Sequence, residues 1–319
     1  MTGLAHRANY QIYCKKKGKK QRFYLIEKSR FGEKKFFDFP ESYFRTQQRI
    51  IVFERQNKFF LYLDSVRLAL LSLPEGEILL DTKIPHLSLI KKICPARPGQ
   101  FLFYKEKGHQ NSFHLYQVQD KQLVLIKAKS LRGGVQLMEP TADGCFVYVA
   151  NTQSQCITLI NTQTFSVVKK WVLPYQILHL KAVDENQLII ALADPQNEGK
   201  QHVSLLRLSN AAREFQLFKP AKVAINSIDL SDDARHVAIL FHDGNNNKSQ
   251  IIALRKQEAV YSNDLPADLT DIRFQHNDTA LYCYGSAACH RYNFFQVRPN
   301  DYPMIVPPQP SRRFDLAAL

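Results

Sequence analysis

Two cysteines and two histidines near the carboxyl-terminal end of the sequence have the side chains best suited to a soft metal ion. They are Cys283, Cys289, His290 and the nearby His276. Zinc usually takes four such ligands and favours closely spaced cysteine pairs. Here the two cysteines fall on neighbouring expected strands among aromatic residues. We therefore interpret both as core or hairpin residues, and we predict no metal site and no cofactor.

Aspartates in polar turns form a second candidate for metal binding. Carboxylates are ligands for hard cations, but an aspartate in a tight turn also accepts hydrogen bonds from its own backbone. The turn interpretation is favoured because each of these turns precedes an apolar run of the same kind. The aspartates are Asp143, Asp184, Asp232, Asp233 and Asp278.

A run of lysines near the amino-terminal end could bind anions. It comprises Lys15, Lys16, Lys17, Lys19 and Lys20. Clustered ammonium groups attract carboxylates and phosphates, but each is a point charge that reads little base sequence. The run predicts a surface for an acidic protein, with nucleic acid or an anionic membrane surface as alternative partners. The other interpretation is a solvated hairpin tip that keeps the protein soluble.

The segment Leu131-Arg132-Gly133-Gly134 is a further candidate for anion binding. It is similar to the Phe/Leu-Arg-Arg-Gly motif of phosphoinositide-binding β-propellers, with one arginine in place of two. This resemblance adds Arg132 to the candidate binding residues and phosphoinositide to the alternative ligands.

The elements that must position these residues are short β-strands. Between Thr141 and Leu173, the runs Cys145–Val149, Cys156–Ile160 and Val167–Val172 are separated by turns rich in Asp, Asn and Gly. β-branched and aromatic residues fit a pleated, half-buried surface, and no helical period competes with this pattern. A sheet of three strands needs neighbours to cover its faces, so we expect more sheets of the same kind.

The segment Tyr148–Asn151 (YVAN), with Asp143-Gly144 before it and Ile157–Thr162 after it, resembles the repeat of YVTN-type β-propellers. These propellers belong to the wider group of WD-repeat-like folds. The Trp-Asp and Gly-His pairs of WD repeats are missing here. Some related propellers are lactonases, so the resemblance keeps a small-molecule hydrolase or lactonase as an alternative function. That chemistry needs acids or histidines converging on a central channel.

The apolar runs recur at a period that is typical of propeller blades. The runs that follow the polar turns begin at Phe101, Phe146, Leu188, Val237 and Leu281, with spacings of 45, 42, 49 and 44 residues. Ile50 and Ile12 continue the series towards the amino-terminal end. We predict an all-β fold, a seven-bladed β-propeller of four-stranded antiparallel blades closed by N- and C-terminal strands. The first blade is expected to lack room for a strand before Tyr10.

The expected organisation is one propeller domain over residues 1–300 and a Pro-rich tail over residues 301–319. The apolar residues at 302–306 could supply a ring-closing strand. No run of 18 apolar residues exists, so we expect no membrane span. No apolar signal core is found either. The tail is also compatible with a bacterial effector that a specialised secretion system exports.

Composition agrees with a large, basic, cytoplasmic domain. The chain has 319 residues, 45% of them hydrophobic, and a net charge of +14. Its six cysteines are far apart, and we interpret them as small buried residues with reduced thiols. They are Cys14, Cys94, Cys145, Cys156, Cys283 and Cys289.

No enzyme motif is present in the sequence, whether nucleophile elbow, phosphate loop, dinucleotide fingerprint or haem attachment. We therefore predict a non-catalytic scaffold that mediates protein–protein interaction. Its binding surface is expected on the loops between second and third strands and on those that join one blade to the next. The polar segments 105–111, 193–201 and 242–249 are such loops.

Overall fold

The computed structural model is built almost entirely of antiparallel β-sheet and divides into two compact units. Unit 1 comprises Met1–Val147 and Ile160–Val168, and unit 2 comprises Tyr148–Leu159 and Lys169–Leu319. The described side chains lie between Leu68 and Cys283, with gaps. The structure describes residues 2–6, 10–17, 20–27, 34–40, 49–53, 58–62, 67–72, 77–84, 86–108, 110–131, 133–151, 155–197, 199–208, 212–231, 233–274, 280–285, 288–293, 295–296, 304–305 and 310–315.

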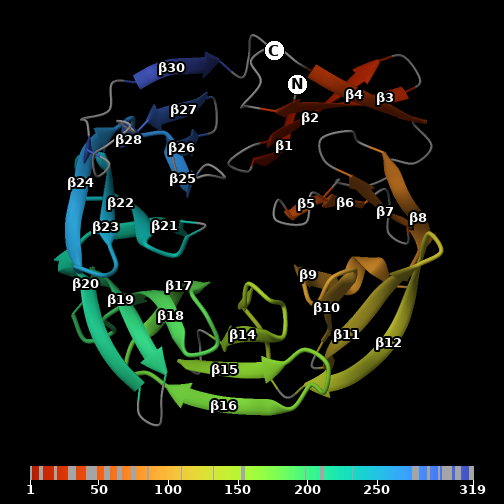
Figure 1. Cartoon of the computed structure of the whole chain (residues 1–319), viewed down its shortest axis with the longest axis horizontal. Helices are drawn as coiled ribbons and strands as arrows, with labels where there is room; N and C mark the ends of the chain where they lie inside the picture. The colour runs from red at the N-terminus through yellow and green to blue at the C-terminus, as the bar shows by residue number, and fades with distance from the viewer. Residues whose placement is uncertain are drawn as a thin grey trace. The chain divides into compact units, whose positions relative to one another are not determined.

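Unit 1 contains three four-stranded sheets in which strands that follow one another in sequence are hydrogen-bonded neighbours (Figure 1). Sheet 1 consists of β1 (Thr2–His6), β2 (Tyr10–Lys17), β3 (Lys20–Glu27) and β4 (Lys34–Pro40). Sheet 2 consists of β5 (Arg49–Phe53), β6 (Lys58–Tyr62), β7 (Arg67–Ser72) and β8 (Ile78–Lys83). Sheet 3 consists of β9 (Ile90–Pro95), β10 (Gln100–Lys107), β11 (Gln110–Gln119) and β12 (Gln122–Leu131).

The remaining four-stranded sheets follow the same plan, except that in sheet 7 the fourth strand does not directly follow the third in sequence. Sheet 4 consists of β13 (Leu137–Pro140), β14 (Phe146–Asn151), β15 (Cys156–Asn161) and β16 (Val167–Val172). Sheet 5, in unit 2, consists of β17 (Gln176–Ala182), β18 (Gln187–Ala193), β19 (Lys200–Leu208) and β20 (Ala212–Lys222). Sheet 6 consists of β21 (Ala224–Leu230), β22 (His236–His242), β23 (Asn247–Ala253) and β24 (Glu258–Leu265). Sheet 7 consists of β25 (Leu269–Phe274), β26 (Ala280–Gly285), β27 (Ala288–Asn293) and β30 (Pro310–Asp315).

This architecture confirms the predicted all-β fold of four-stranded antiparallel sheets. The five positions that carry the repeat each lie at the start of the second strand of a sheet: Phe101, Phe146, Leu188, Val237 and Leu281. Ile12 also lies on a second strand, β2. Ile50 does not: it lies on β5, the first strand of sheet 2, and Phe59 of β6 occupies the equivalent position. The expectation that the first blade lacks an inner strand is wrong, because β1 pairs with β2.

The chain near its carboxyl-terminal end contributes two further strands. Met304–Ile305 (β29) pairs with Phe295–Gln296 (β28) in a separate two-stranded sheet. Pro310–Asp315 (β30) pairs with β27 and completes sheet 7. The first and last strands of the chain thus lie in different sheets, and closure of a ring by terminal strands stays a prediction.

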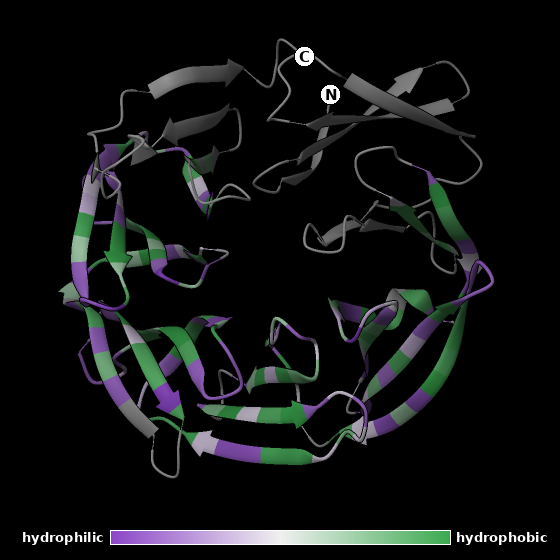
Figure 2. Cartoon of the chain, in the orientation of Figure 1, coloured by the Kyte–Doolittle hydropathy of each residue, from purple (hydrophilic) through white to green (hydrophobic). Residues whose placement is uncertain are grey.

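Burial follows strand position within each sheet. The second strands β18 and β22 each carry five consecutive buried residues, whereas the fourth strands β12 and β16 are mostly exposed. Figure 2 shows hydrophilic and hydrophobic residues mixed along the fourth strands β12 and β24. A strand buried on both faces must be apolar throughout, which explains why the second strands dominate the sequence repeat.

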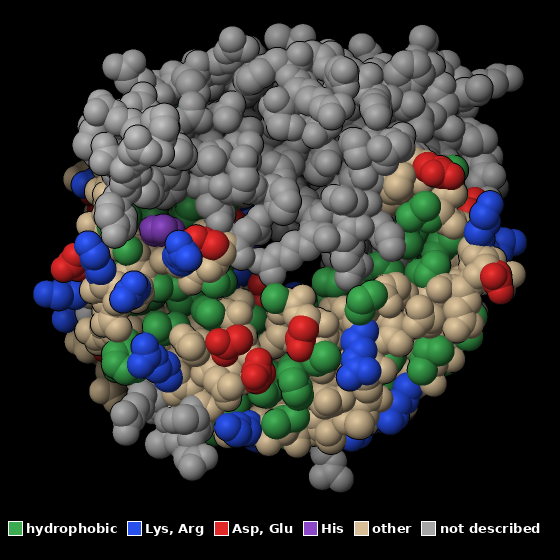
Figure 3. All heavy atoms as spheres, in the orientation of Figure 1, with side chains coloured by type: hydrophobic (Ala, Val, Ile, Leu, Met, Phe, Trp, Pro, Cys, Tyr) green, Lys and Arg blue, Asp and Glu red, His purple; other side chains and the backbone are tan. Residues whose placement is uncertain are grey.

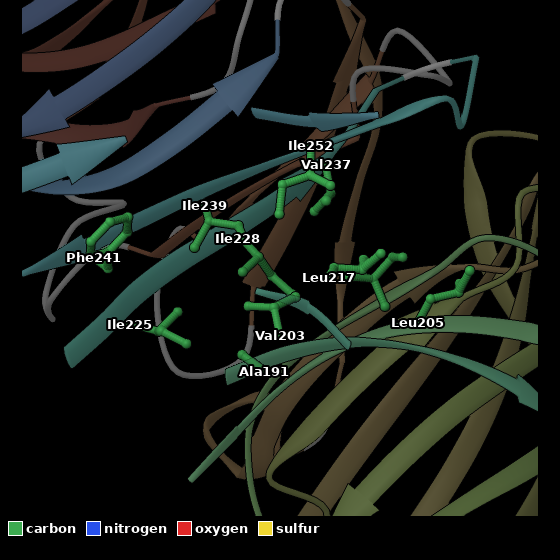
Figure 4. Close-up of a cluster of buried hydrophobic side chains, with 11 residues drawn as sticks. Ala191, Val203, Leu205, Leu217, Ile225, Ile228, Val237, Ile239, Phe241 and Ile252 are labelled. Atoms are coloured by element: carbon green, nitrogen blue, oxygen red, sulfur yellow. The ribbon is translucent and has the colours of Figure 1, made fainter. Parts of the chain in front are cut away.

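The core of unit 2 lies between the sheets. Side chains of sheets 5 and 6 form one buried cluster, in which Val203, Ile239 and Ile252 are fully inaccessible to solvent (Figure 4). A second cluster joins sheet 6 to sheet 7 through residues that include Leu240, Ile272 and Leu281. The part of the chain that the structure describes contains no helix able to cross a bilayer; its one helical element is the 3₁₀ turn η3 (Leu87–Leu89).

Candidate binding surface

The loops between second and third strands, and the connections from a fourth strand to the next sheet, lie at the same end of each antiparallel sheet. We call this end the loop face. In unit 1 it includes residues 108 and 133–136, and in unit 2 it includes residues 194–197, 199, 243–246 and 266–268. Loops held on a rigid scaffold commonly carry binding residues. The contacts that fix these segments therefore determine how rigidly the loop face presents its residues.

Amide side chains at the beginning of three third strands bind the connection to the following sheet or the beginning of its first strand. Asn111 of β11 donates from Nδ2 to the carbonyl oxygen of Gly133 at 2.8 Å. Gln201 of β19 accepts from the backbone N–H of Ile225 at 2.7 Å. Asn247 of β23 donates from Nδ2 to the carbonyl oxygens of Ala267 and Leu269, each at 2.8 Å, and to that of Pro266 at 3.1 Å. We call these three residues the amide clamps.

Replacing Asn247 with alanine is expected to destabilise the protein by about 1–3 kcal/mol, because the buried carbonyl group of Leu269 loses a donor. Asn247 is 1% exposed. Urea unfolding checks the free energy. Asn245→Ala in the same loop is the matched control, since the Asn245 side chain is exposed. Equal losses of unfolding free energy in the two variants would contradict the stabilising role of Asn247.

Aspartates stiffen the loops of unit 2 from within. Asp194 accepts hydrogen bonds from the backbone N–H groups of Gln196 and Asn197. Asp243 accepts from the backbone N–H of Asn246 at 3.0 Å and forms an ion pair of 2.7 Å with Lys248. Hydrogen bonds lower the pKa of both carboxyl groups, chiefly the one from the Asn197 side-chain amide for Asp194 and the one from the Asn246 backbone N–H for Asp243. The loop face is therefore held by side chains that are already paired.

The turns at the opposite end of the sheets confirm the structural interpretation of the recurrent aspartates. The Oδ1 atoms of Asp143, Asp184 and Asp233 accept backbone N–H groups two residues further on, at 3.0, 2.6 and 2.9 Å. Asp232 and Asp278 lie outside the described residues. Among the described residues, no group of three or more potential metal-binding side chains is present.

The lysine run lies at the loop face of sheet 1. The register of β2 and β3 ends with Lys17 opposite Lys20, so Lys15, Lys16, Lys17 and Lys20 continue the strands, although a longer loop is expected from the sequence. Lys19 lies outside the described residues, as does Arg132, and the side chains of the whole run are not described. Their role in binding stays a prediction. On the face drawn in Figure 3, the Lys and Arg side chains that are described are dispersed among acidic, polar and apolar ones.

The cysteines whose side chains the structure describes are free thiols: Cys94, Cys145, Cys156 and Cys283. Cys283 is fully buried in the cluster that joins sheets 6 and 7, and it lies opposite His290, with Cys289 on the same neighbouring strand. This confirms the core interpretation for Cys283. Burial raises the pKa of the Cys94 thiol, which keeps this thiol protonated and unreactive.

A network of charged side chains that the sequence analysis missed links the first strands of sheets 5, 6 and 7. At its centre, a carboxylate oxygen of Asp229 lies 3.2 Å from Lys181 Nζ and 3.4 Å from Arg273 Nη1. Asp229 Oδ2 accepts the backbone N–H of Phe274 at 2.9 Å. Burial raises the pKa of Asp229, but the two cations outweigh it and hold the pKa below its ordinary value. We call these side chains, together with Asp271, the inner charge network.

The cations and carboxylates of the inner charge network neutralise one another. Asp271 lies 3.2 Å from Arg273 Nη2 and accepts a hydrogen bond of 2.5 Å from Ser227. The nearby His179 ring is hydrogen-bonded to the carbonyl oxygen of Ile225, and burial lowers the pKa of His179. A nucleophilic relay needs a serine in contact with a histidine base. Here the serine contacts a carboxylate, so the arrangement favours a structural role.

Comparison with known proteins supports the fold and leaves the activity open. No protein-family model and no curated protein sequence matches the chain. Among solved structures, the chain is similar to the WD40 domain of Pan2 from Neurospora crassa, with 16% identity, coverage of 82% of this chain and 79% of that one, and a TM-score of 0.53. It is also similar to the Cps50 (Swd1) β-propeller domain of Myceliophteria thermophila, with 12% identity, coverage of 72% and 73%, and a TM-score of 0.55.

A third similar structure is an enzyme, the hydrazine synthase of Kuenenia stuttgartiensis. Its identity to this chain is 12%, the coverage is 74% of this chain and 73% of that one, and the TM-score is 0.54. One fold therefore occurs both in WD40 domains and in an enzyme, and it does not decide the activity. At such identities the likeness concerns the fold. In its fold, this chain is a β-propeller.

Proposed function

We propose that the protein is a non-catalytic scaffold that binds another protein through its loop face, and that the lysine run of the β2–β3 hairpin favours an acidic partner. The observation that carries the proposal is the set of amide clamps. Asn111, Gln201 and Asn247 occupy the first or second position of a third strand, and each binds the connection to the following sheet or the beginning of its first strand. Loops fixed before binding lose less conformational entropy when a partner docks.

The electrostatics support an acidic partner. The chain carries 43 Lys and Arg against 29 Asp and Glu, and opposite net charges accelerate association between proteins. The charged groups of the inner charge network are matched to one another. They therefore supply no free charge for a partner, and the lysine run is the strongest remaining concentration of positive charge in the sequence.

Reversing the charge of the five lysines is expected to reduce recovery of the partner by at least about tenfold, because long-range attraction and direct ion pairs are lost together. The variant replaces Lys15, Lys16, Lys17, Lys19 and Lys20 with glutamate. Quantitative affinity purification from matched lysates, compared with wild type, gives the measurement.

The matched control replaces five exposed basic residues at the opposite end of the sheets with glutamate, which produces the same change in net charge. These residues lie in turns between first and second or between third and fourth strands: Arg97, Lys121, Arg235, Arg255 and Lys256. The control is expected to recover the partner as wild type does. Equal losses in both variants would show that net charge alone matters. Recovery of nucleic acid or anionic lipid in place of protein would favour the alternative partners.

A further inference from the structure

Four polar side chains gather on one face of sheet 3 in unit 1, near its loop face. In the register of β10 and β11, Lys105 lies opposite Ser112. Ser112, His114 and Tyr116 alternate along β11, and alternate residues of a strand point to the same side of the sheet. We call Lys105, Ser112, His114 and Tyr116 the Lys105 cluster.

Direct contacts hold the Lys105 cluster together. Lys105 Nζ donates to the Tyr116 hydroxyl at 3.2 Å and lies 5.7 Å from the centre of the Tyr116 ring. Ser112 Oγ lies 2.9 Å from His114 Nε2. The His114 ring is stacked on the Tyr116 ring with a centroid distance of 6.3 Å. The four side chains thus form one contiguous polar group beside the apolar core that contains Tyr116 and Phe103.

The charge of the Lys105 cluster is not balanced within it. The Lys105 ammonium is half-buried, and among the described residues its polar partner is the neutral Tyr116 hydroxyl. Burial lowers the pKa of Lys105. Burial and the Lys105 charge lower the pKa of His114 to about 4, so His114 is neutral near pH 7. A partly buried cation carries a desolvation cost, and no ion pair of Lys105 is found among the described residues, so an anion would offset this cost.

The Lys105 cluster also has an excess of hydrogen-bond donors. Within the described part of the chain, the buried Nδ1 atom of His114 has no hydrogen-bond partner. If Ser112 donates to His114 Nε2, the neutral ring carries its proton on Nδ1 and this donor is unused. If Nε2 donates to Ser112, the serine hydroxyl hydrogen is unused. The Tyr116 hydroxyl accepts from Lys105 and keeps its own hydrogen, so every arrangement leaves donors and a positive charge for an acceptor.

We propose that the Lys105 cluster binds one carboxylate, supplied by an Asp or Glu side chain from an acidic segment of the partner protein. The inference rests on the proposed function and names a contact within it. A carboxylate matches the cluster because it carries one negative charge and two acceptor oxygens. A phosphate monoester carries nearly two charges, which exceeds the single cation available. The cluster lies a short distance along β10 and β11 from the loop at 108–109, where a segment docked on the loop face would pass.

Isothermal titration calorimetry with hexaglutamate blocked at both ends tests the proposal. Lys105→Met keeps the apolar stem and removes the charge, and we expect it to weaken binding by about tenfold or more, the usual effect of losing a hydrogen bond to a charged group. Lys107→Met is the matched control: Lys107 lies on the same strand, carries the same charge and is exposed. It is expected to bind nearly as wild type does. Equal affinities for the two variants, or no binding of hexaglutamate to wild type, would overturn the proposal.

Further measurements separate the sources of the anion and the effects on folding. Acetate at the same concentration of carboxylate is expected to bind undetectably; binding as tight as that of hexaglutamate would overturn the assignment to a protein segment. Displacement of hexaglutamate by an equal concentration of inorganic phosphate would overturn the assignment to a carboxylate. Lys105→Met is expected to melt at or above the wild-type temperature, since a partly buried charge is removed. Loss of hexaglutamate binding in the hairpin variant alone, with Lys105→Met unaffected, would defeat this inference and leave the proposed function standing.

Discussion

Gly144→Ala is expected to destabilise the protein by about 3–5 kcal/mol, since it combines a strained backbone with a steric overlap. Gly144 has φ +68°, in the left-handed region. A Cβ atom there would lie 1.9 Å from the carbonyl oxygen of Ala96 and 2.2 Å from its carbon. Both are backbone atoms, so the overlap cannot be relieved by a side-chain rotation. Urea unfolding gives the free energy.

Gly108→Ala isolates the backbone part of this effect. Gly108 has φ +58°, and no heavy atom of the described residues outside its chain neighbours lies within 4 Å of the position that an alanine Cβ would take. The Gly108→Ala variant should lose only about 1–2 kcal/mol of unfolding free energy, the usual cost of the left-handed conformation for alanine. If the two variants lose equal stability, the close approach of Ala96 to Gly144 does not restrict this position.

Asp229→Asn is expected to cost about 3–5 kcal/mol of unfolding free energy, the usual effect of removing one partner from a buried ion pair. The Asp229 side chain is 13% exposed and faces both Lys181 and Arg273. Asparagine retains an acceptor for the Phe274 N–H but leaves the two cations facing a neutral amide. Asp264→Asn is the control. Its side chain is 74% exposed and 3.8 Å from Lys248, so it should lose at most about 1 kcal/mol.

The same variant should change the dependence of stability on pH. The folded protein holds the pKa of Asp229 below the value of an unfolded aspartate. Ionised Asp229 therefore stabilises the fold above the unfolded pKa, and this contribution is lost as the pH falls through the lower, folded value. In Asp229→Asn the loss of stability on acidification should be smaller than in wild type. Parallel acid-unfolding curves for the two proteins would show that Asp229 is not the group responsible.

The sequence predicts most of the fold because burial and backbone geometry act locally. The second strands are apolar on both faces, so the runs from Phe101, Leu188 and Val237 could be recognised without knowledge of their neighbours. The turn aspartates bind N–H groups two residues away, which is also local. The place of Ile50 in the repeat is wrong because an apolar first strand resembles an apolar second strand in sequence.

The binding surface was harder to predict because its contacts join distant residues. An amide such as Asn247 at the start of a strand resembles a solvated loop residue, and its partners lie about twenty residues further on. Asp229 and Arg273 belong to different sheets. Along β11, Ser112, His114 and Tyr116 alternate with buried residues, a pattern that normally indicates a solvent-facing side. Their position on the same face as Lys105 appears only when β10 and β11 are placed in register.

Among the described residues, six of the seven four-stranded sheets are built from strands that follow one another directly in sequence, whereas in sheet 7 the strands β28 and β29 lie between β27 and β30. A nascent chain could therefore complete one sheet while the next is still being translated, and few pairings would have to wait for remote sequence. Errors in assembly would then arise mainly when finished sheets pack against one another. The apolar clusters between sheets would favour the correct packing.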